Sequence, residues 1–186
     1  MESPAETTNQ NKQKFRIGHI LAWIGLLVFL TVLALGLIRS QQGSISVGSQ
    51  VPDFSLTTPD GKQLNLADQR GKIVVLNFWA SWCKPCEQEA ADLEAAWKFY
   101  ETRGDVVFWG INYVDVEPEA IKYLKKYSIS YPNAPDLGTR VSQIFRTRGV
   151  PETYFIDRQG KLVYAQIGPF SSIEQIKGII EPLLGK

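Results

Sequence analysis

The chain has 186 residues, and its 20 lysines and arginines nearly balance its 19 aspartates and glutamates, which gives a formal net charge of +1. This length accommodates one domain plus an appendage, and the near-neutral charge, with no basic block outside the N-terminal flank, argues against nucleic-acid binding. A structural zinc site uses four ligands, usually cysteine and histidine, so two cysteines and the single His19 make such a site unexpected.

The N-terminal forty residues predict a membrane anchor. Residues 1–16 are polar, and we expect them to form a disordered cytoplasmic tail. The run from Ile20 to Ile38 carries no charge, and as a helix rising about 1.5 Å per residue it would span roughly 28 Å, enough for the hydrocarbon core of a bilayer. We therefore expect one transmembrane helix over residues 17–39.

The charges on either side of this run predict its orientation. Lys12, Lys14 and Arg16 precede it, whereas Arg39 alone follows closely. The positive-inside rule then places the N-terminus inside and the rest of the chain on the extracytoplasmic, periplasmic side of the cytoplasmic membrane. A cleaved signal peptide is the alternative. The apolar run is longer than a usual signal-peptide core, which favours an uncleaved signal-anchor.

After a linker over residues 40–50, the pattern of residues 51–186 alternates between strand and helix signals. This order predicts an α/β fold, a central mixed sheet flanked by helices, with an N-terminal hairpin and a central helical insertion. The expected elements are a hairpin of 54–56 and 63–66, a buried strand over 73–78, a helix over 85–103, a strand over 106–111, helices over 118–126 and 139–145, a hairpin of 153–156 and 161–164, and a helix over 172–184.

The two cysteines, Cys83 and Cys86, lie between the buried strand and the long helix that follows it. This spacing allows the first turn of the helix to carry both sulfurs, with Cys83 exposed at the N-terminus and Cys86 partly covered. A thiolate at a helix N-terminus is stabilised by the macrodipole and by unpaired N–H groups, which lowers its pKa. The pair therefore indicates a dithiol–disulfide redox couple.

A closely spaced cysteine pair has two other uses, as a haem attachment site or as a static structural disulfide. A c-type haem attachment site needs histidine directly after the second cysteine, and here that residue is Glu87. A static structural disulfide is the remaining alternative. A bridge that closes so short a loop constrains the unfolded chain little, which favours the redox interpretation.

Two segments resemble a known family. They are Phe-Trp-Ala-Ser-Trp-Cys-Lys-Pro-Cys at 78–86 and Gly-Val-Pro-Glu-Thr-Tyr-Phe-Ile-Asp at 149–157. Both are similar to the thioredoxin-fold proteins of cytochrome c maturation, most closely the CcmG/DsbE branch within the TlpA/ResA group. The similarity runs from Val51 to Leu184 and includes Gly-Ile-Asn-Tyr at 110–113. It implies a thioredoxin-like fold and thiol–disulfide oxidoreductase activity.

The resemblance also implies roles for single residues. Cys83 would be the attacking cysteine and Cys86 the resolving one. Pro151 would be a cis-proline beside the disulfide, with neighbouring backbone that pairs with a substrate strand. Glu89 matches the acidic residue that this family keeps near its active site, although it could be a solvated helix glutamate. Glu152 matches the glutamate after the cis-proline, although it could instead favour basic substrates or cap local backbone.

The substrate-binding residues expected from these positions are Trp82, Val150, Pro151 and Glu152. Trp82 adjoins the nucleophile and is expected to form a rim for an extended substrate. The implied substrate is the Cys-x-x-Cys-His disulfide of apocytochrome c, or a haem-handling partner that carries it. A membrane thiol-electron donor of the CcdA/DsbD type would re-reduce the protein. We expect no cofactor besides the Cys83–Cys86 disulfide and no metal.

Other functions stay open at this point. A general extracytoplasmic exchange protein or a disulfide-forming oxidase would share the cysteine motif. A peroxiredoxin-type peroxidase would need a Pro-x-x-x-Thr segment before its reactive cysteine, and none precedes Cys83. A non-enzymatic assembly module would tolerate the loss of both cysteines.

Overall fold

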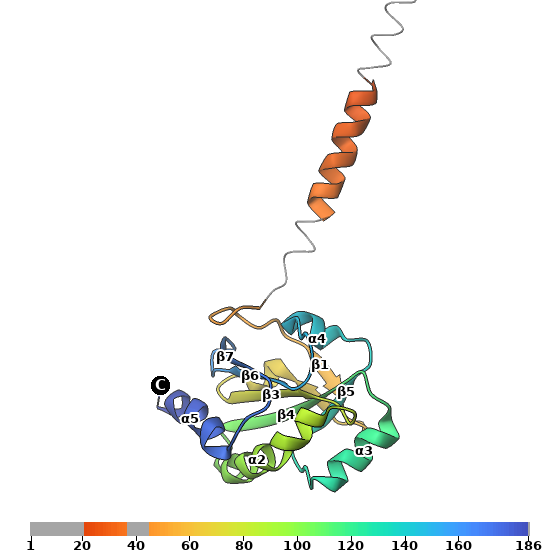
Figure 1. Cartoon of the computed structure of the whole chain (residues 1–186). Coiled ribbons are helices and arrows are strands. Elements are labelled where there is room, and N and C mark those ends of the chain that lie inside the picture. Colours follow the sequence, from red (N-terminus) through yellow and green to blue (C-terminus); the bar gives the residue numbers. More distant parts are fainter. Residues whose placement is uncertain (1–20, 37–44, 186) are drawn as a thin grey trace, which may run out of the picture. The chain divides into compact units, whose positions relative to one another are not determined.

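The computed structural model describes residues 21–36 and 45–185 (Figure 1). The chain divides into two compact units, Met1–Gly43 and Ser44–Lys186. In the first unit, residues 21–36 form a helix with exposed side chains. None of the helices in the described ranges is both long and apolar enough to cross a membrane. The predicted tail and both ends of the predicted anchor lie outside the described residues.

The second unit is built on a central mixed sheet, as predicted, and this sheet has five strands. Its strand order is β5-β4-β3-β6-β7, in which β3, β4 and β5 are parallel while β6 and β7 run antiparallel to their neighbours. A separate antiparallel hairpin, β1–β2, precedes it. The strands are β1 (Ser55–Thr57), β2 (Gln63–Asn65), β3 (Ile73–Trp79), β4 (Val106–Tyr113), β5 (Asn133–Asp136), β6 (Glu152–Ile156) and β7 (Leu162–Ile167).

The central strand β3 has a layer of structure on both faces. Because successive strand side chains point to opposite faces, Val74, Leu76 and Phe78 enter one core and Ile73 and Val75 enter the other. This explains why the strand is a continuous apolar run rather than an alternating one. Burying each such side chain contributes about 1.5–3 kcal/mol.

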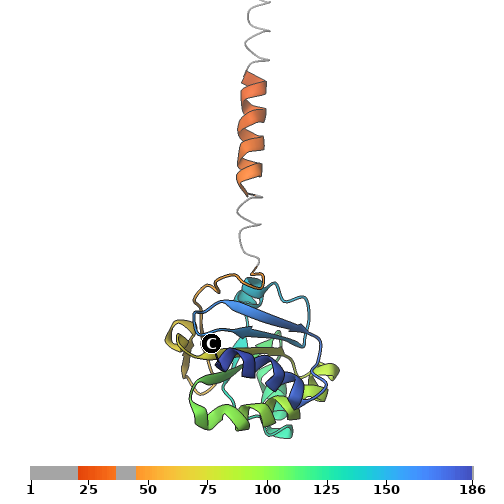
Figure 2. The same cartoon turned by 90° about the vertical axis from the view of Figure 1, so that its left-hand side faces the viewer.

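Helices cover both faces of the sheet. The α-helices are α2 (Lys84–Tyr100), α3 (Glu117–Lys126), α4 (Arg140–Phe145) and α5 (Ile173–Leu184), with short 3-10 turns η1 (Leu66–Gln69) and η2 (Glu101–Arg103). Helices α2 and α5 lie side by side on one face (Figures 1 and 2), where Leu93 and Ile176 share a core. Helix α4 and the β1–β2 hairpin pack on the other face through Phe145 and Leu56.

Strand β5 was not predicted. Its sequence, Asn-Ala-Pro-Asp, has no β-branched or aromatic residue, so it carries no strand signal. The strand forms because it pairs with β4, from Gly110 opposite Asn133 to Tyr113 opposite Asp136. Pro135 is tolerated because β5 is at the edge of the sheet.

Candidate active site

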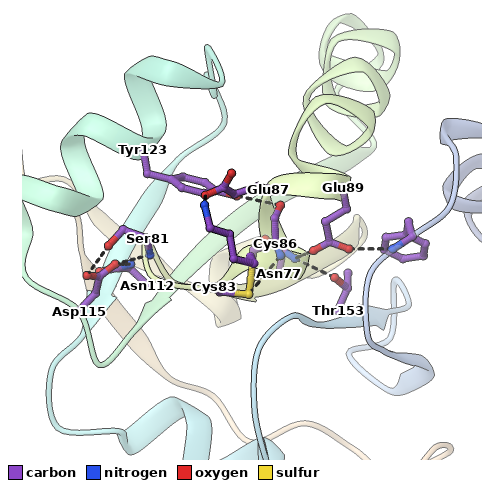
Figure 3. Close-up of a disulfide and its surroundings, with 12 residues drawn as sticks. Asn77, Ser81, Cys83, Cys86, Glu87, Glu89, Asn112, Asp115, Tyr123 and Thr153 are labelled. Carbon is purple, nitrogen blue, oxygen red and sulfur yellow. Dashed lines mark hydrogen bonds and ion pairs between the residues drawn. A yellow bond between two sulfur atoms is a disulfide. The ribbon is translucent and has the colours of Figure 1, made fainter.

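Cys83 and Cys86 form a disulfide at the N-terminus of α2 (Figure 3). The S–S distance is 2.01 Å, and the two Cα atoms lie 5.3 Å apart. Cys83 is the N-cap of the helix, and its Sγ accepts the backbone N–H of Cys86 at 3.1 Å. Pro85 fits the first turn because it has no N–H that would need a partner there. Both sulfur atoms therefore lie at the positive end of the helix dipole.

The expectation that Cys83 is exposed at the helix N-terminus is wrong for this disulfide form. Cys83 is 3% exposed and Cys86 is 1% exposed. The two cysteines belong to a cluster with Trp79, Ala80 and Tyr123 among its members, and Val150 packs against it. Of these residues, Tyr123 comes from α3 and Val150 from the loop before β6, and both lie far from the motif in sequence.

Pro151 follows a cis peptide bond from Val150, as the resemblance implied. Because Val150 packs against the cysteine cluster, the cis-proline loop lies beside the disulfide. Trp82 is 58% exposed and donates its indole N–H to the carbonyl of Val114 at 3.1 Å. Trp82 thus comes from the loop before α2, Val150 and Pro151 come from the loop before β6, and Glu152 is the first residue of β6.

Glu152 is buried, and its carboxylate is engaged within the protein. Oε1 accepts the backbone N–H of Arg148 at 3.0 Å, and Oε2 accepts the hydroxyl of Tyr154. Of the two alternatives considered from the sequence, this geometry matches the capping of local backbone. Glu152 braces the turn that leads into Pro151.

Glu89 is 1% exposed and faces the interior of the domain. Asn77 donates its side-chain amide to Oε1 at 2.9 Å, and the backbone N–H of Phe170 donates to Oε2 at 2.9 Å (Figure 3). Burial raises the pKa of Glu89 to about 7, although these two hydrogen bonds oppose the shift. A carboxyl with a pKa near neutrality can both accept and release a proton under physiological conditions.

Asn77 is a site residue that the sequence analysis missed. Its amide also donates to Oγ1 of Thr153 at 2.9 Å, so one side chain in β3 links Glu89 in α2 to β6. The available signal was its position, because Asn77 is the polar residue within the apolar run of β3. A buried amide in such a strand needs hydrogen-bonding partners.

Asp115 is a second residue that was missed. Its carboxylate accepts the backbone N–H of Ser81 at 2.6 Å, the Ser81 hydroxyl at 2.8 Å and the Asn112 amide at 2.9 Å (Figure 3). Burial tends to raise the pKa of Asp115, but the hydrogen bonds from Asn112 and Ser81 outweigh it, and the pKa is lowered. Asp115 therefore fixes the loop that carries Trp82 and Cys83.

The first turn of α2 carries a neutralised pair of charges. Glu87 accepts hydrogen bonds from the Tyr127 hydroxyl at 2.7 Å and from the Lys84 ammonium at 3.0 Å, which lower its pKa to about 2. Lys84 is thus paired with an ionised carboxylate on its own helix. Tyr123 donates its hydroxyl to the Cys86 carbonyl at 2.8 Å and stacks on Trp79.

Within residues 21–36 and 45–185, no group of three or more histidine, cysteine, aspartate or glutamate side chains is arranged to hold a metal ion. The reactive group of the site is the Cys83–Cys86 pair, whose disulfide can be reduced and formed again. A dithiol–disulfide pair at a helix N-terminus, beside a cis-proline loop in this mixed sheet, defines a thiol–disulfide oxidoreductase of the thioredoxin fold.

Comparison with known proteins agrees with this class. The chain belongs to the AhpC/TSA family, whose model matches residues 47–165. The thiol-disulfide oxidoreductase ResA of Bacillus cereus (strain ZK / E33L) is 30% identical over 174 residues, which cover 94% of this chain and 98% of that protein. ResA of Bacillus subtilis (strain 168) is 31% identical over 141 residues, 75% of this chain and 78% of that protein.

A solved structure is similar as well. The crystal structure of a Chlorobium tepidum protein, proposed to be the thiol:disulfide interchange protein DsbE, superposes with a TM-score of 0.69 at 28% identity. The match covers 76% of this chain and 99% of that one. The expected place of the chain in the TlpA/ResA-like group is confirmed.

Proposed function

We propose that this protein is a membrane-anchored, extracytoplasmic protein-disulfide reductase. Its substrate is the Cys-x-x-Cys-His disulfide of apocytochrome c, or a haem-handling partner that carries it, during cytochrome c maturation. The observation that carries the proposal is the Cys83–Cys86 pair at the N-terminus of α2, placed beside the cis-Pro151 loop. The similarity to ResA and DsbE proteins supports it.

The reaction is two thiol–disulfide exchanges. The Cys83 thiolate attacks one sulfur of the substrate disulfide, which forms a mixed disulfide and releases the other substrate sulfur as a thiolate. The Cys86 thiolate then attacks Cys83 Sγ, which releases the second substrate sulfur and closes the Cys83–Cys86 disulfide. Two electrons pass from the protein to the substrate. A membrane thiol-electron donor of the CcdA/DsbD type returns two electrons to the protein.

Glu89 serves as the proton acceptor for Cys86 in this scheme. It lies three residues after Cys86 on α2, a spacing that places two side chains on the same helix face with Cβ atoms about 5–6 Å apart. Its pKa of about 7 suits proton exchange near neutrality. The described domain, residues 45–185, contains no histidine, so no imidazole competes for this role.

The substrate strand lies along the two loops that flank the disulfide. Trp82 offers an exposed aromatic face on one side. On the other side, the backbone of Val150 before the cis-proline offers hydrogen-bonding groups, whereas the Pro151 carbonyl already accepts the Gly168 N–H at 3.0 Å. Glu152 acts on this surface indirectly, because it holds the Arg148 backbone N–H in the preceding turn.

The uncharged run from Ile20 to Ile38 supports the proposed anchor, and the basic residues before it support an extracytoplasmic domain. After alkaline carbonate washing, the full-length chain should stay with the membrane fraction. The domain that carries Cys83 and Cys86 should be accessible to protease added outside the cytoplasmic membrane. Release of the chain by carbonate would contradict the anchor.

The substrate is tested with the variant Cys86→Ser. This change removes the resolving thiol, so the mixed disulfide with Cys83 should accumulate on an apocytochrome peptide that carries an oxidised Cys-x-x-Cys-His. Mass spectrometry of the non-reduced adduct gives the measurement. The control Cys83→Ser should form no adduct. The absence of an adduct with Cys86→Ser under the same conditions would overturn the substrate proposal.

The direction of electron flow is tested by the reduction potential of Cys83–Cys86. We expect a value near that of thioredoxin, about −270 mV, or somewhat above it, measured in glutathione and dithiothreitol buffers. A value near −120 mV, typical of a strong periplasmic oxidant, would instead make the protein a disulfide donor.

A further inference from the structure

Three arginines lie exposed on and after α4, and we refer to Arg140, Arg146 and Arg148 as the arginine patch. The surrounding stretch, residues 137–151, contains no aspartate, no glutamate and no lysine. The patch is therefore a local concentration of positive charge on a chain whose net charge is only +1. Residues 137–151 also lead directly into the cis-proline loop.

The two carboxylates that flank this stretch form no ion pair with its arginines. Asp136 is buried and accepts the Val141 and Ser142 backbone N–H groups together with the Ser142 hydroxyl. Glu152 is buried and accepts the Arg148 backbone N–H and the Tyr154 hydroxyl. Within the described residues, the ion pairs leave all three guanidinium groups of the arginine patch unpaired.

The arginine patch adjoins the disulfide from two directions. Arg146 and Arg148 line an open hollow of about 380 Å³ together with Tyr113. Tyr113 directly precedes Val114, whose carbonyl accepts the indole N–H of the rim residue Trp82. On the other side, only Gly149 separates Arg148 from Val150, which packs against the cysteine cluster, so the Cα atoms of Arg148 and Val150 lie within about 7.6 Å by chain length alone.

We propose that the arginine patch binds acidic side chains that flank the cysteines of the disulfide-bearing substrate. This inference rests on the proposed reductase function and adds a substrate preference to it. Guanidinium groups bind carboxylates through paired hydrogen bonds. An extended strand rises about 3.3 Å per residue, so acidic residues about two to four positions from the attacked cysteine reach Arg146 and Arg148.

Charge at the rim of a binding site acts mainly on the association rate and on its salt dependence. Salt screens exposed charges, with a Debye length of about 10 Å at 0.1 M ionic strength. The arginine patch therefore selects among substrate disulfides most strongly at low ionic strength. The chemical exchange at Cys83 is the same for every substrate.

The test uses the reduced full-length protein and three oxidised Cys-x-x-Cys-His peptides, with acidic, neutral or lysine residues flanking the cysteines. The measured quantity is the second-order rate constant of disulfide exchange. The variant is Arg146→Gln/Arg148→Gln. The matched control, Lys72→Gln/Lys161→Gln, removes the same charge near the start of β3 and β7, at the opposite end of β3 from the disulfide.

We expect the wild type and the control to reduce the acidic peptide about tenfold faster than the lysine peptide at low ionic strength, a preference that shrinks at high salt. The double glutamine variant should lower this ratio to about twofold or less while it keeps the neutral-peptide rate. Arg146→Glu/Arg148→Glu should reverse the preference.

Two results would overturn the inference alone: a wild type without preference, or a preference that survives in Arg146→Gln/Arg148→Gln. If the wild type reduces none of the three peptides, the proposed function itself fails and the inference fails with it. Reduction of the neutral peptide therefore separates the two failures.

Discussion

At the scale of single residues, the site depends on a few buried polar side chains that link separate elements. Asn77 donates to both Glu89 and Thr153, and so joins α2, β3 and β6 behind the disulfide. Glu89 also accepts the backbone N–H of Phe170. Ionising a buried carboxyl costs free energy in the folded state. The free energy of unfolding therefore depends on pH.

The pH dependence has a definite sign. The pKa of Glu89 rises from an ordinary 4.5 to about 7 on folding, a difference worth about 3 kcal/mol. Below pH 4.5 the group is protonated in both states and costs nothing. As the pH rises towards 7, the unfolded chain ionises first, so Glu89 destabilises the fold progressively, and fully above 7.

We therefore predict that Glu89→Gln, which cannot ionise, gains stability relative to the wild type by about 3 kcal/mol between pH 4 and pH 8. Urea unfolding of both oxidised proteins over this range measures the difference. The glutamine loses one of two acceptor contacts, which adds a constant offset but no slope. Parallel stability curves for the two proteins would contradict a raised pKa for Glu89.

At the scale of elements, the order of strands and helices around the cysteine pair was predictable from sequence. The apolar run before Trp79 and the helical spacing of Ala90, Leu93 and Tyr100 are local signals, and the structure confirms both. Strand β5 was not predictable, because its formation depends on pairing with β4 rather than on its own residues.

The candidate site likewise has residues that local sequence identifies and residues whose role depends on distant contacts. Cys83, Cys86 and Pro151 were identified from short motifs, whereas the role of Asp115 requires a contact with Ser81 across 34 positions of sequence. No periodicity in the chain encodes such a contact. The burial of Cys83 was missed for the same reason, because Tyr123 and Val150 reach its cluster from other elements.

The loop between β3 and α2 gives a prediction at this scale. Asp115→Ala should leave the Ser81 backbone N–H without its acceptor and should lower the free energy of unfolding by about 1–3 kcal/mol. Asp115→Asn keeps one acceptor oxygen and should cost less. Because the pKa of Asp115 is lowered on folding, its ionised form is stabilising, and this contribution is lost as the pH falls below 3.8.

The measurement is urea unfolding of the wild type, Asp115→Asn and Asp115→Ala at pH 7 and at acid pH. The difference between the wild type and Asp115→Asn should shrink in acid. A difference that stays constant with pH would show that the carboxylate charge has no part in holding the loop.

At the scale of the whole molecule, the redox domain contains its own core and begins earlier in the chain than the expected boundary at Val51. The backbone N–H of Gly48 donates to the Leu162 carbonyl at 2.7 Å, and that of Val51 donates to the Gly160 carbonyl at 2.9 Å. Val51 itself is buried in the main core. The polar composition of this stretch predicted a linker, because composition does not reveal backbone pairing with a distant turn.

This pairing predicts where the chain can be cut. A protein of residues 44–186 keeps every described contact of the second unit, so it should unfold at the same urea concentration as the domain in the full-length chain. A protein of residues 52–186 loses the buried Val51 side chain and the hydrogen bonds of Gly48 and Val51. These losses are worth about 3 kcal/mol together. The shorter protein should therefore be less stable by that amount and should unfold at a lower urea concentration. Equal stability of the two truncated proteins would show that residues 44–51 are a linker after all.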